Sequence, residues 1–231
     1  MQLLTKASLI VCALALVLPA TAQEERPVPV EKAAYHWPVF SNEHIALLRV
    51  YFPPGRGSNY HIHSTDQISV LVEAGANAGQ ILGQQPTPPR PGTRGTVSFT
   101  AYSKKSMTHK STNMGSTPFH NIVVALLKPQ PGNFAPAARD VAGYTQVFDN
   151  ERVRGWKLAL EPGQTAGPIA QKAPGLRVVI DGGEIAEIVP GQLDRGLFLR
   201  MGNFYWQDAG TTRAVKNIGT TRVEIAEFEL K

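Results

Sequence analysis

The chain has 231 residues, enough for two small domains or one larger one, and its formal net charge is +5. This mild basic excess forms no block of like charges, and the short cluster Lys104, Lys105 and Lys110 is typical of a solvated loop, so a nucleic-acid partner is excluded. The single cysteine, Cys12, lies near the start, so any metal site in the rest of the chain must use nitrogen and oxygen ligands.

The first 22 residues have the pattern of a signal peptide. One positive charge precedes a short apolar run, and ATA at 20–22 supplies the small residues of a signal-peptidase site. Cleavage after Ala22 would start the mature chain at Gln23 and lower the formal charge from +5 to +4, because Lys6 is the one charged residue removed. The alternatives are an uncleaved membrane anchor and a lipoprotein, the latter disfavoured by the valine before Cys12. We therefore expect a periplasmic or secreted protein that is free of the membrane after cleavage.

The remaining sequence indicates an all-β protein. Apolar runs are short and alternate with polar residues, and they predict strands at 44–52, 68–75 and 121–127. Residues 84–95 are rich in proline and predict a loop, and residues 129–143 resemble a linker. No stretch after the leader has the period of an amphipathic helix.

The two sides of this linker resemble each other. FSNEHIALLRVYFPPG ends at Gly55 and FDNERVRGWKLALEPG ends at Gly163, an offset of 108, while HKSTNMGST (109–117) corresponds to RAVKNIGTT (213–221) at an offset of 104. This order of landmarks predicts a duplicated all-β unit of roughly 90 residues. Such a unit buries one face of each strand, which two antiparallel sheets closed into a small barrel achieve.

Two histidines of the first half stand one residue apart. In an extended strand, residues i and i+2 project to the same side, about 6.6 Å apart. His61 and His63 can therefore direct two imidazoles at one point, and a third ligand must come from a neighbouring strand. His109 is the best candidate for that ligand.

The spacing around these histidines resembles the first motif of the cupins, G-x5-H-x-H-x3,4-E-x6-G. Five residues separate Gly55 from His61, His63 completes the pair, and three more residues lead to Gln67, where the family has glutamate. The closing glycine arrives one position late, at Gly75.

The second cupin motif ends in H-x3-N, which His109 and Asn113 match. Lys104 and Ser106 replace the proline and the glycine that the motif places upstream. The resemblance covers about residues 33–128 and, through the internal repeat, 144–231.

This resemblance implies two tandem cupin domains, each a double-stranded β-helix or jelly roll. It also implies that the first domain holds one divalent transition metal ion on His61, His63 and His109, with Gln67 as the fourth ligand. Histidine nitrogens admit iron, manganese, nickel, copper, cobalt or zinc. Because a glutamine is neutral, it would leave the full charge of the ion on the site and make the ion a stronger Lewis acid.

Other interpretations of the first half remain open. The paired histidines fit two polar residues of a strand without a metal, Gln67 fits a bystander, and Asp66 fits a fourth ligand, although strand alternation turns it away. A hydrolytic triad of Ser64, Asp66 and a histidine requires neighbours on one strand to converge. The histidines outside the motif, which we interpret as surface or core residues, are His36, His44 and His120.

The second half carries no equivalent ligands. The residues at the corresponding positions are Ile169, Gln171, Gly175 and Arg213, and no histidine follows His120. Arg213 fits either a partner for an anionic ligand or a structural salt bridge. We therefore predict a degenerate second domain and one metal ion per chain.

Similar cupins include dioxygenases of the quercetinase kind, isomerases, polyketide cyclases, lyases and decarboxylases. The resemblance implies an exported metal-dependent oxidoreductase, a quercetinase-like dioxygenase that acts on a small organic molecule. The alternatives are a non-redox isomerase, cyclase or lyase, and a non-catalytic cupin that binds a small molecule or metal. Tyr60, Asp66 and Glu73 are candidates for acid–base chemistry, and a homodimer is left open.

Overall fold

The computed structural model describes residues 26–128 and 134–231, so the predicted signal peptide lies outside the described residues. Within these two ranges the one helical element is a 3-10 turn, η1 (Val30–Lys32), and the regular structure is otherwise β-strand. No helix among the described residues is long and apolar enough to cross a membrane. The prediction of an all-β protein is confirmed.

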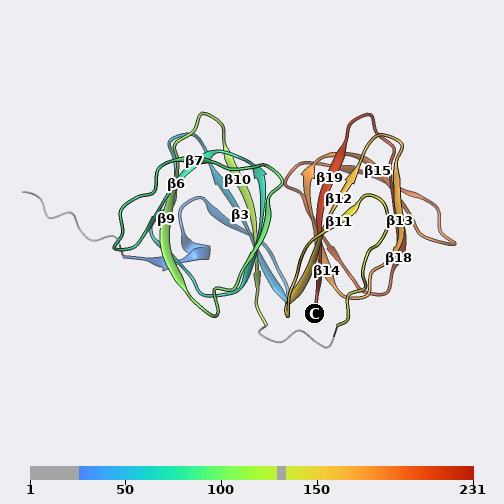
Figure 1. Ribbon diagram of the computed structural model, residues 1–231, viewed down its shortest axis with the longest axis horizontal. Coiled ribbons are helices and arrows are strands. Elements are labelled where there is room, and N and C mark those ends of the chain that lie inside the picture. Colours follow the sequence, from blue (N-terminus) through green and yellow to red (C-terminus); the bar gives the residue numbers. More distant parts are fainter. Residues whose placement is uncertain (1–25, 129–133) are drawn as a thin grey trace, which may run out of the picture.

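The first half forms two five-stranded sheets that close into a barrel (Figure 1). One sheet has the order β1-β4-β9-β6-β7, and the other has the order β2-β3-β10-β5-β8. The strands are β1 (Val28–Pro29), β2 (His36–Ser41), β3 (Ile45–Phe52), β4 (His61–His63), β5 (Gln67–Glu73), β6 (Ala76–Ile81), β7 (Arg90–Pro91), β8 (Val97–Thr100), β9 (Met107–Asn113) and β10 (Phe119–Leu126).

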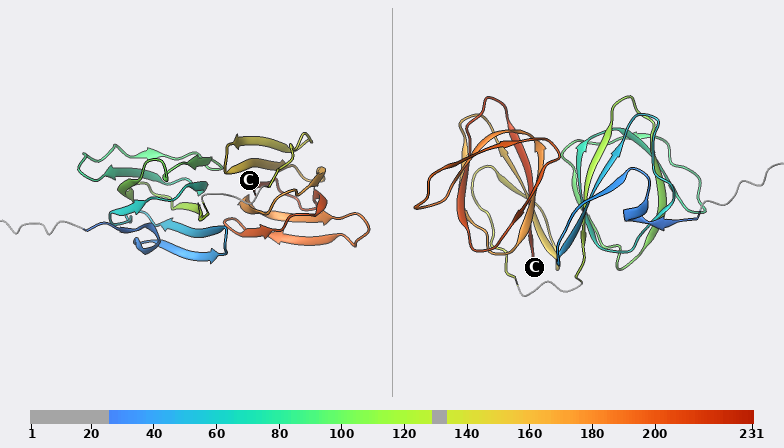
Figure 2. Two further views of the ribbon diagram at one scale, coloured as in Figure 1. Left: turned by 90° about the horizontal axis from the view of Figure 1, so that it is seen from below. Right: turned by 180° about the vertical axis from the view of Figure 1, so that it is seen from behind.

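The second half forms another two-sheet barrel beside the first, as the views in Figure 2 also show. Its sheets have the orders β11-β12-β19-β14-β17 and β13-β18-β15-β16. The strands are β11 (Tyr144–Asp149), β12 (Val153–Leu160), β13 (Thr165–Ala170), β14 (Gly175–Asp181), β15 (Gly183–Ile188), β16 (Arg195–Leu199), β17 (Phe204–Gln207), β18 (Thr212–Asn217) and β19 (Val223–Leu230).

The internal duplication is confirmed by equivalent hydrogen bonds in the two barrels. The side-chain amide of Asn113 donates to the carbonyls of Phe52 and Thr117 at 3.0 and 2.8 Å. Asn217, 104 residues later, donates to the carbonyls of Leu160 and Thr221 at 2.9 and 2.8 Å. Each asparagine thus connects the last residue of a long strand, β3 or β12, to the turn that precedes the final strand of its barrel, β10 or β19.

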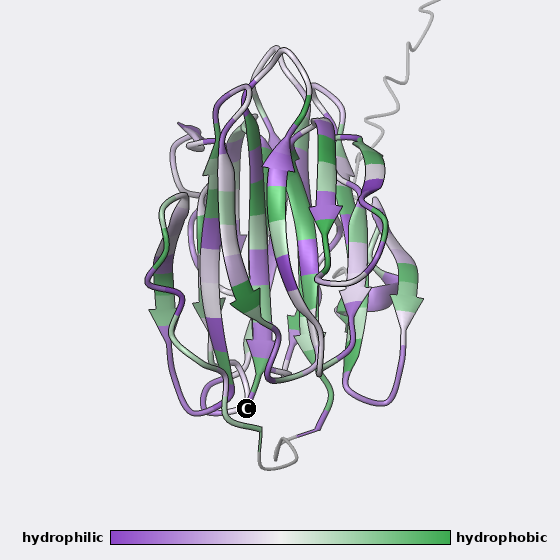
Figure 3. Ribbon diagram, turned by 90° about the vertical axis from the view of Figure 1, so that its right-hand side faces the viewer, coloured by the Kyte–Doolittle hydropathy of each residue, from purple (hydrophilic) through white to green (hydrophobic). Residues whose placement is uncertain are grey.

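The central strands are buried on both faces because the two barrels pack against each other. On β3, Ile45 and Leu47 belong to a core cluster shared with Val178 and Phe228 of the second barrel, whereas Leu48 and Val50 face the interior of the first. Alternate strand residues point to opposite faces, so one strand serves both cores. Figure 3 shows hydrophobic and hydrophilic residues alternating in bands along the strands.

The barrel interiors differ in how much apolar side chain fills them. The interior cluster of the second barrel contains Leu158, Leu160, Ala166, Val179, Ile185, Leu199, Val215, Val223 and Ile225. The corresponding cluster of the first barrel contains only Leu48, Val50, Phe52 and Val123 among the described residues. The first barrel therefore keeps internal space, and its histidines lie beside that space.

The predicted strands agree with β3, β5 and β10 within two residues at each end. The proline-rich loop 84–95 also contains the short strand β7, which pairs with β6. β1 precedes residue 33, where the sequence places the start of the first domain, and it pairs with β4. The domain boundaries otherwise stay predictions.

Candidate metal centre

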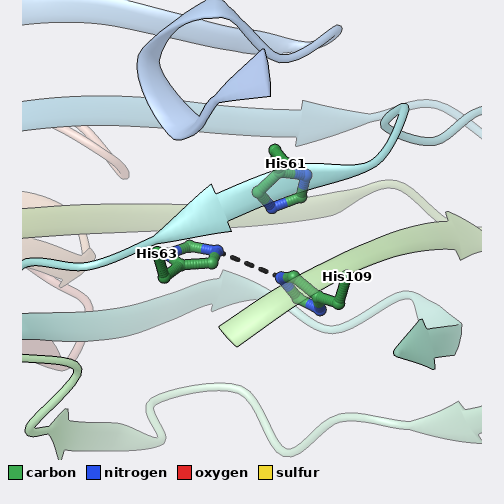
Figure 4. A group of neighbouring side chains, drawn as sticks. All are labelled: His61, His63 and His109. Atoms are coloured by element: carbon green, nitrogen blue, oxygen red, sulfur yellow. Dashed lines mark hydrogen bonds between the residues drawn. The ribbon is translucent and has the colours of Figure 1, made fainter. Parts of the chain in front are cut away.

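Two neighbouring strands carry the three histidines. β4 contains His61 and His63 with one residue between them, and β9 lies antiparallel to β4 with His109 directly opposite His61. Because residues i and i+2 of a strand share a face, all three imidazoles project to the barrel interior. Figure 4 shows them turned toward one another from the two strands.

The three side chains lie at distances suited to one metal ion. Nε2 of His63 is 3.0 Å from Nε2 of His109, and one ring nitrogen from each histidine falls within 4.8 Å of the other two. His61 and His63 are buried, and His109 is half-buried. Three imidazole nitrogens that converge in this way form a donor set for a transition metal.

The other nitrogen of two of these rings has its own partner. Nδ1 of His61 is 2.9 Å from the carbonyl of Asn59, and Nδ1 of His63 is 2.9 Å from the amide oxygen of Gln67. Each of these oxygens accepts a hydrogen bond from an Nδ1–H group. This tautomer leaves Nε2 free as a ligand atom, and metal-binding histidines are commonly oriented in the same manner.

The surroundings favour the neutral form of these imidazoles. Burial, followed by the positive charges that neighbouring histidines would carry, lowers the pKa of His63 to about 4 and that of His109 to about 3. Burial also lowers the pKa of His61. A neutral imidazole is the form that binds a metal ion, so the site is ready to do so at neutral pH.

Two further aromatic side chains belong to this site, although the sequence motif does not contain them. His36 of β2 is buried with its ring centroid 4.7 Å from that of His61, and its Nδ1 bonds to the carbonyl of Ala34. Tyr102 stacks on His63 with centroids 4.8 Å apart, and burial raises the pKa of its phenol. Both residues lie far from the paired histidines in sequence, so no spacing rule could have located them.

A cavity of about 250 Å³ adjoins the histidines and is lined by all four imidazoles, Gln67 and Tyr102. We call it the metal cavity. A second cavity of about 480 Å³, the chamber, lies next to it, and His63, Gln67 and Val123 line both. The first barrel thus provides room for a small organic molecule beside the candidate ligands.

The other predicted site residues of the first barrel lie elsewhere. The carboxylate of Asp66 accepts hydrogen bonds from Arg152 at 2.8 Å and from the backbone of Ser103 at 2.9 Å, so it points away from the histidines. Glu73 faces His120 at 3.6 Å. Neither they nor Tyr60 line the metal cavity.

The remaining two histidines and Ser64 also lie outside the metal cavity. His44 stacks on Trp206 where the barrels meet, and His120 is buried beside Tyr51. Ser64 lines the chamber, and its neighbour Asp66 is occupied by Arg152, so the structure does not assemble the hydrolytic triad.

The second barrel has an ion-pair network at the equivalent place. Ile169 pairs with Arg213 across β13 and β18, in the same register as His61 with His109. Arg213 donates to Glu227 at 3.4 Å, so of its two predicted roles the structural salt bridge is the one found.

Three buried guanidinium groups and three carboxylates make up this network: Arg139, Arg177, Arg213, Glu187, Glu227 and Glu229. Arg139 comes from the segment between the barrels and lies over the ring of Trp156 at 4.1 Å. Burial opposes ionisation of Glu227, but the surrounding arginines hold its pKa well below the usual range. Fixed charges of the protein therefore occupy the position that histidines occupy in the first barrel.

No protein-family model matches this sequence, and no curated protein sequence matches it. Solved structures do resemble it. AerE from Microcystis aeruginosa superposes with a TM-score of 0.57 and 12% sequence identity, over 86% of this chain and 98% of AerE.

A salicylate 1,2-dioxygenase from Pseudaminobacter salicylatoxidans superposes with a TM-score of 0.54 and 13% identity, over 88% of this chain and 77% of that chain. Another structure of that enzyme, with a TM-score of 0.52, contains adducts with gentisate. A cupin 2 conserved barrel domain protein from Leptotrichia buccalis superposes with a TM-score of 0.51 and 9% identity, over 85% of this chain and 88% of that chain. The strand order, the histidine cluster and these neighbours together show that the chain has the cupin fold, repeated in two tandem barrels.

Proposed function

We propose that this protein is an exported metal-dependent cupin enzyme, most similar in chemistry to the quercetinase-like dioxygenases, that acts on a small organic molecule in the first barrel. The observation that carries the proposal is the convergence of His61, His63 and His109 beside an internal cavity. The structural similarity to the salicylate 1,2-dioxygenase supports the proposal at the level of the fold alone.

The donor set of the site fits a divalent transition metal ion. Three neutral imidazoles would hold the ion through Nε2, while Asn59 and Gln67 fix the rings of His61 and His63 from behind. Iron, manganese, nickel, copper, cobalt and zinc all bind such nitrogens. When bound, a redox-active ion would supply the electron transfer that lets molecular oxygen react with an organic molecule.

Several residues around the ligands are suited to positioning a substrate. The candidate acid–base groups Asp66 and Glu73 are engaged by Arg152 and His120 outside the metal cavity. Within its wall, the uncharged side chains of Ser69, Ser111 and Asn121 can orient a substrate by hydrogen bonds. His36 and Tyr102 are titratable and line the same cavity, so a non-redox isomerase or lyase is the alternative that oxygen uptake separates from a dioxygenase.

Oxygen uptake tests the proposal. Protein purified without a histidine tag is analysed for metal, loaded with each candidate ion, and assayed with flavonols, diketones and enols. We expect uptake that His61→Ala abolishes. Absence of uptake with every ion, together with a ligand-induced thermal shift, would instead support a non-catalytic binding protein.

Export is the second part of the proposal, and it rests on the signal-peptide pattern of residues 1–22. Mass spectrometry of periplasmic or secreted protein should give an N-terminus at Gln23. An intact Met1 on protein recovered from the cytoplasm would contradict it.

A further inference from the structure

The chamber beside the metal cavity has an apolar wall. Leu48 and Val123 are buried in it, and its space exists because Ala46 of β3 lies directly opposite Ala125 of β10, two of the smallest side chains. Larger residues at this pair would fill the barrel at this level. In the second barrel the corresponding pair is Arg154 opposite Glu229, two larger side chains, and Glu229 is buried in the ion-pair network. The small size of these two alanines therefore leaves the chamber open.

The rim of the chamber leaves large apolar side chains in contact with solvent. Ile62 is 38% exposed and Leu127 is 45% exposed, and both line the chamber. Exposed apolar surface around a concave site is typical of a ligand-binding pocket, because a ligand removes that surface from water.

In the metal-free protein, the charge of both walls disfavours anionic ligands. Among the residues that line the chamber and the metal cavity there is no lysine and no arginine, and Glu31 is the one acidic side chain. A carboxylate buried in the chamber would lose its hydration without gaining a cationic side chain, and in the metal-free protein the same holds for the metal cavity. An uncharged ligand avoids this cost.

The metal cavity offers hydrogen-bond acceptors from both of its sheets. Asn77 of β6 and Asn121 of β10 line it, and the side-chain oxygen of each is buried without a hydrogen-bond partner. An unpaired buried acceptor is unfavourable, so a ligand that brings a hydroxyl or an N–H group to these amides is stabilised.

We propose that the two cavities together bind an uncharged, mainly apolar molecule that carries a hydroxyl or another hydrogen-bond donor. Its apolar body lies in the chamber, and its donor end enters the metal cavity along the shared wall of His63, Gln67 and Val123. The role of the ligand's donor end beside the metal ion rests on the proposed function, whereas the preference of the chamber for an uncharged apolar body does not. The chamber thus differs from a site that pairs a carboxylate with a lysine or arginine side chain.

Two bicyclic probes of nearly equal size test the charge preference. The first is 2-naphthol, which is uncharged at pH 7 and bears a hydroxyl, and the second is 2-naphthoate, which is an anion. Fluorescence titration of the metal-loaded full chain, and of the same protein after metal removal, gives both dissociation constants. We expect the metal-free protein to bind 2-naphthol at least about tenfold more tightly than 2-naphthoate, a difference of ~1.4 kcal/mol.

Chamber-filling variants locate the binding. Ala125→Leu and Ala46→Leu should each weaken 2-naphthol binding at least about tenfold, because each fills the space that the alanine pair leaves open. Ala78→Leu on β6 is the matched control, since Ala78 is half-buried and lines neither cavity. Azide binding to the cobalt-loaded protein, followed by visible absorption, should remain the same in all three variants.

The outcomes separate this inference from the proposed function. Tighter binding of 2-naphthoate to the metal-free protein, or 2-naphthol binding that survives both chamber variants, overturns the inference. Azide binding to the cobalt-loaded protein without any 2-naphthol binding overturns the inference but leaves the metal centre in place. Chamber-dependent 2-naphthol binding by a protein that takes up no metal supports the inference and overturns the proposed function.

Discussion

The amide oxygen of Gln67 lies 2.9 Å from Nδ1 of His63, whereas the Nε2 atom of the same ring faces His109. The two nitrogens of an imidazole point in diverging directions, so an oxygen at Nδ1 lies outside the coordination sphere of an ion bound at Nε2. In this arrangement Gln67 sets the tautomer and the orientation of His63. The sequence motif alone predicts the same residue as a fourth ligand.

The first prediction concerns Gln67→Ala. Removal of the acceptor frees the ring of His63, and loss of such a supporting partner typically lowers metal affinity about 10–100-fold. Chelator competition with zinc measures the change. Ser69→Ala, on the same strand and in the wall of the same cavity, is the control and should leave the affinity unchanged.

A crystal structure of the zinc-loaded wild-type protein separates the two roles of Gln67, and the affinity of Gln67→Glu accompanies it. A carboxylate that accepts from Nδ1–H makes His63 more basic, so affinity should stay the same or rise. We expect the wild-type amide oxygen to remain at Nδ1. A zinc–oxygen distance of about 2.1 Å to Gln67 would show instead that it is a ligand.

The second prediction concerns the pH dependence of the metal-free protein. Unfolded histidines take up protons near their ordinary pKa of 6.5, whereas in the folded protein the pKa is about 4 for His63 and about 3 for His109. Between these values the unfolded state binds more protons, so the free energy of unfolding should decrease as pH falls from about 6.5 to about 4. Above pH 6.5 this contribution is fully present.

Urea unfolding at several pH values measures this decrease. His109→Gln removes one titrating group and should make the pH dependence of the metal-free protein less steep. A wild-type free energy of unfolding that is constant between pH 6.5 and 4 would contradict the burial of neutral imidazoles at this site.

The third prediction concerns metal stoichiometry. Elemental analysis after gel filtration should give one equivalent per chain, because in the second barrel Ile169 and Arg213 occupy the register positions of His61 and His109. His109→Ala should lose most of the metal and remain folded, since barrel packing does not depend on the ion. Arg213→Ala should keep the full equivalent, and a second tightly held equivalent in the wild type would contradict the prediction.

The sequence predicts the repeated unit well because its determinants are local. The paired histidines lie two residues apart, so strand alternation alone places them on one face. Asn113 and Asn217 recur at a fixed offset and make the same backbone contacts in both barrels. These features need no knowledge of distant residues.

The sequence could not predict the features that depend on tertiary packing. His36 joins the site from β2, and its nearest partner, His61, is 25 residues away in a different sheet. Arg139 lies in a stretch whose composition predicts a linker. It is nevertheless buried, because it forms ion pairs with Glu227 and Glu229 inside the second barrel. Such contacts follow from how the barrels close, which no short motif encodes.

The fourth prediction concerns the ion pair that joins the barrels. A carboxylate oxygen of Asp66 in the first barrel lies 2.8 Å from a guanidinium nitrogen of Arg152 in the second, and both side chains are shielded from solvent. Arg152→Ala leaves the carboxylate buried without its partner and should destabilise the protein by about 3 kcal/mol in urea unfolding. Arg152→Ala with Asp66→Ala should recover part of the loss, because no unpaired charge then remains. Equal destabilisation by the single and double variants would show that the pair is not coupled.

The last prediction concerns Glu227, the carboxylate that contacts all three arginines of the second barrel. It accepts from Arg177 at 2.7 Å and from Arg213 at 3.4 Å, and it also pairs with Arg139. Glu227→Gln keeps the side-chain volume but leaves one uncompensated positive charge in the core, which should cost about 3 kcal/mol of unfolding free energy. Glu184→Gln, on the exposed side of β15, is the control and should cost less than about 0.5 kcal/mol.

The pH dependence of this difference identifies its electrostatic origin. The arginines hold the pKa of Glu227 well below its ordinary value of 4.5, so its contribution is fully present above that value and is lost only as pH falls toward the lower folded pKa. The difference between wild type and Glu227→Gln should therefore be constant from pH 5 to 8 and shrink in stronger acid. A difference that is equally small for Glu227→Gln and Glu184→Gln would mean that the network adds no stability, and that apolar packing alone keeps the second barrel closed.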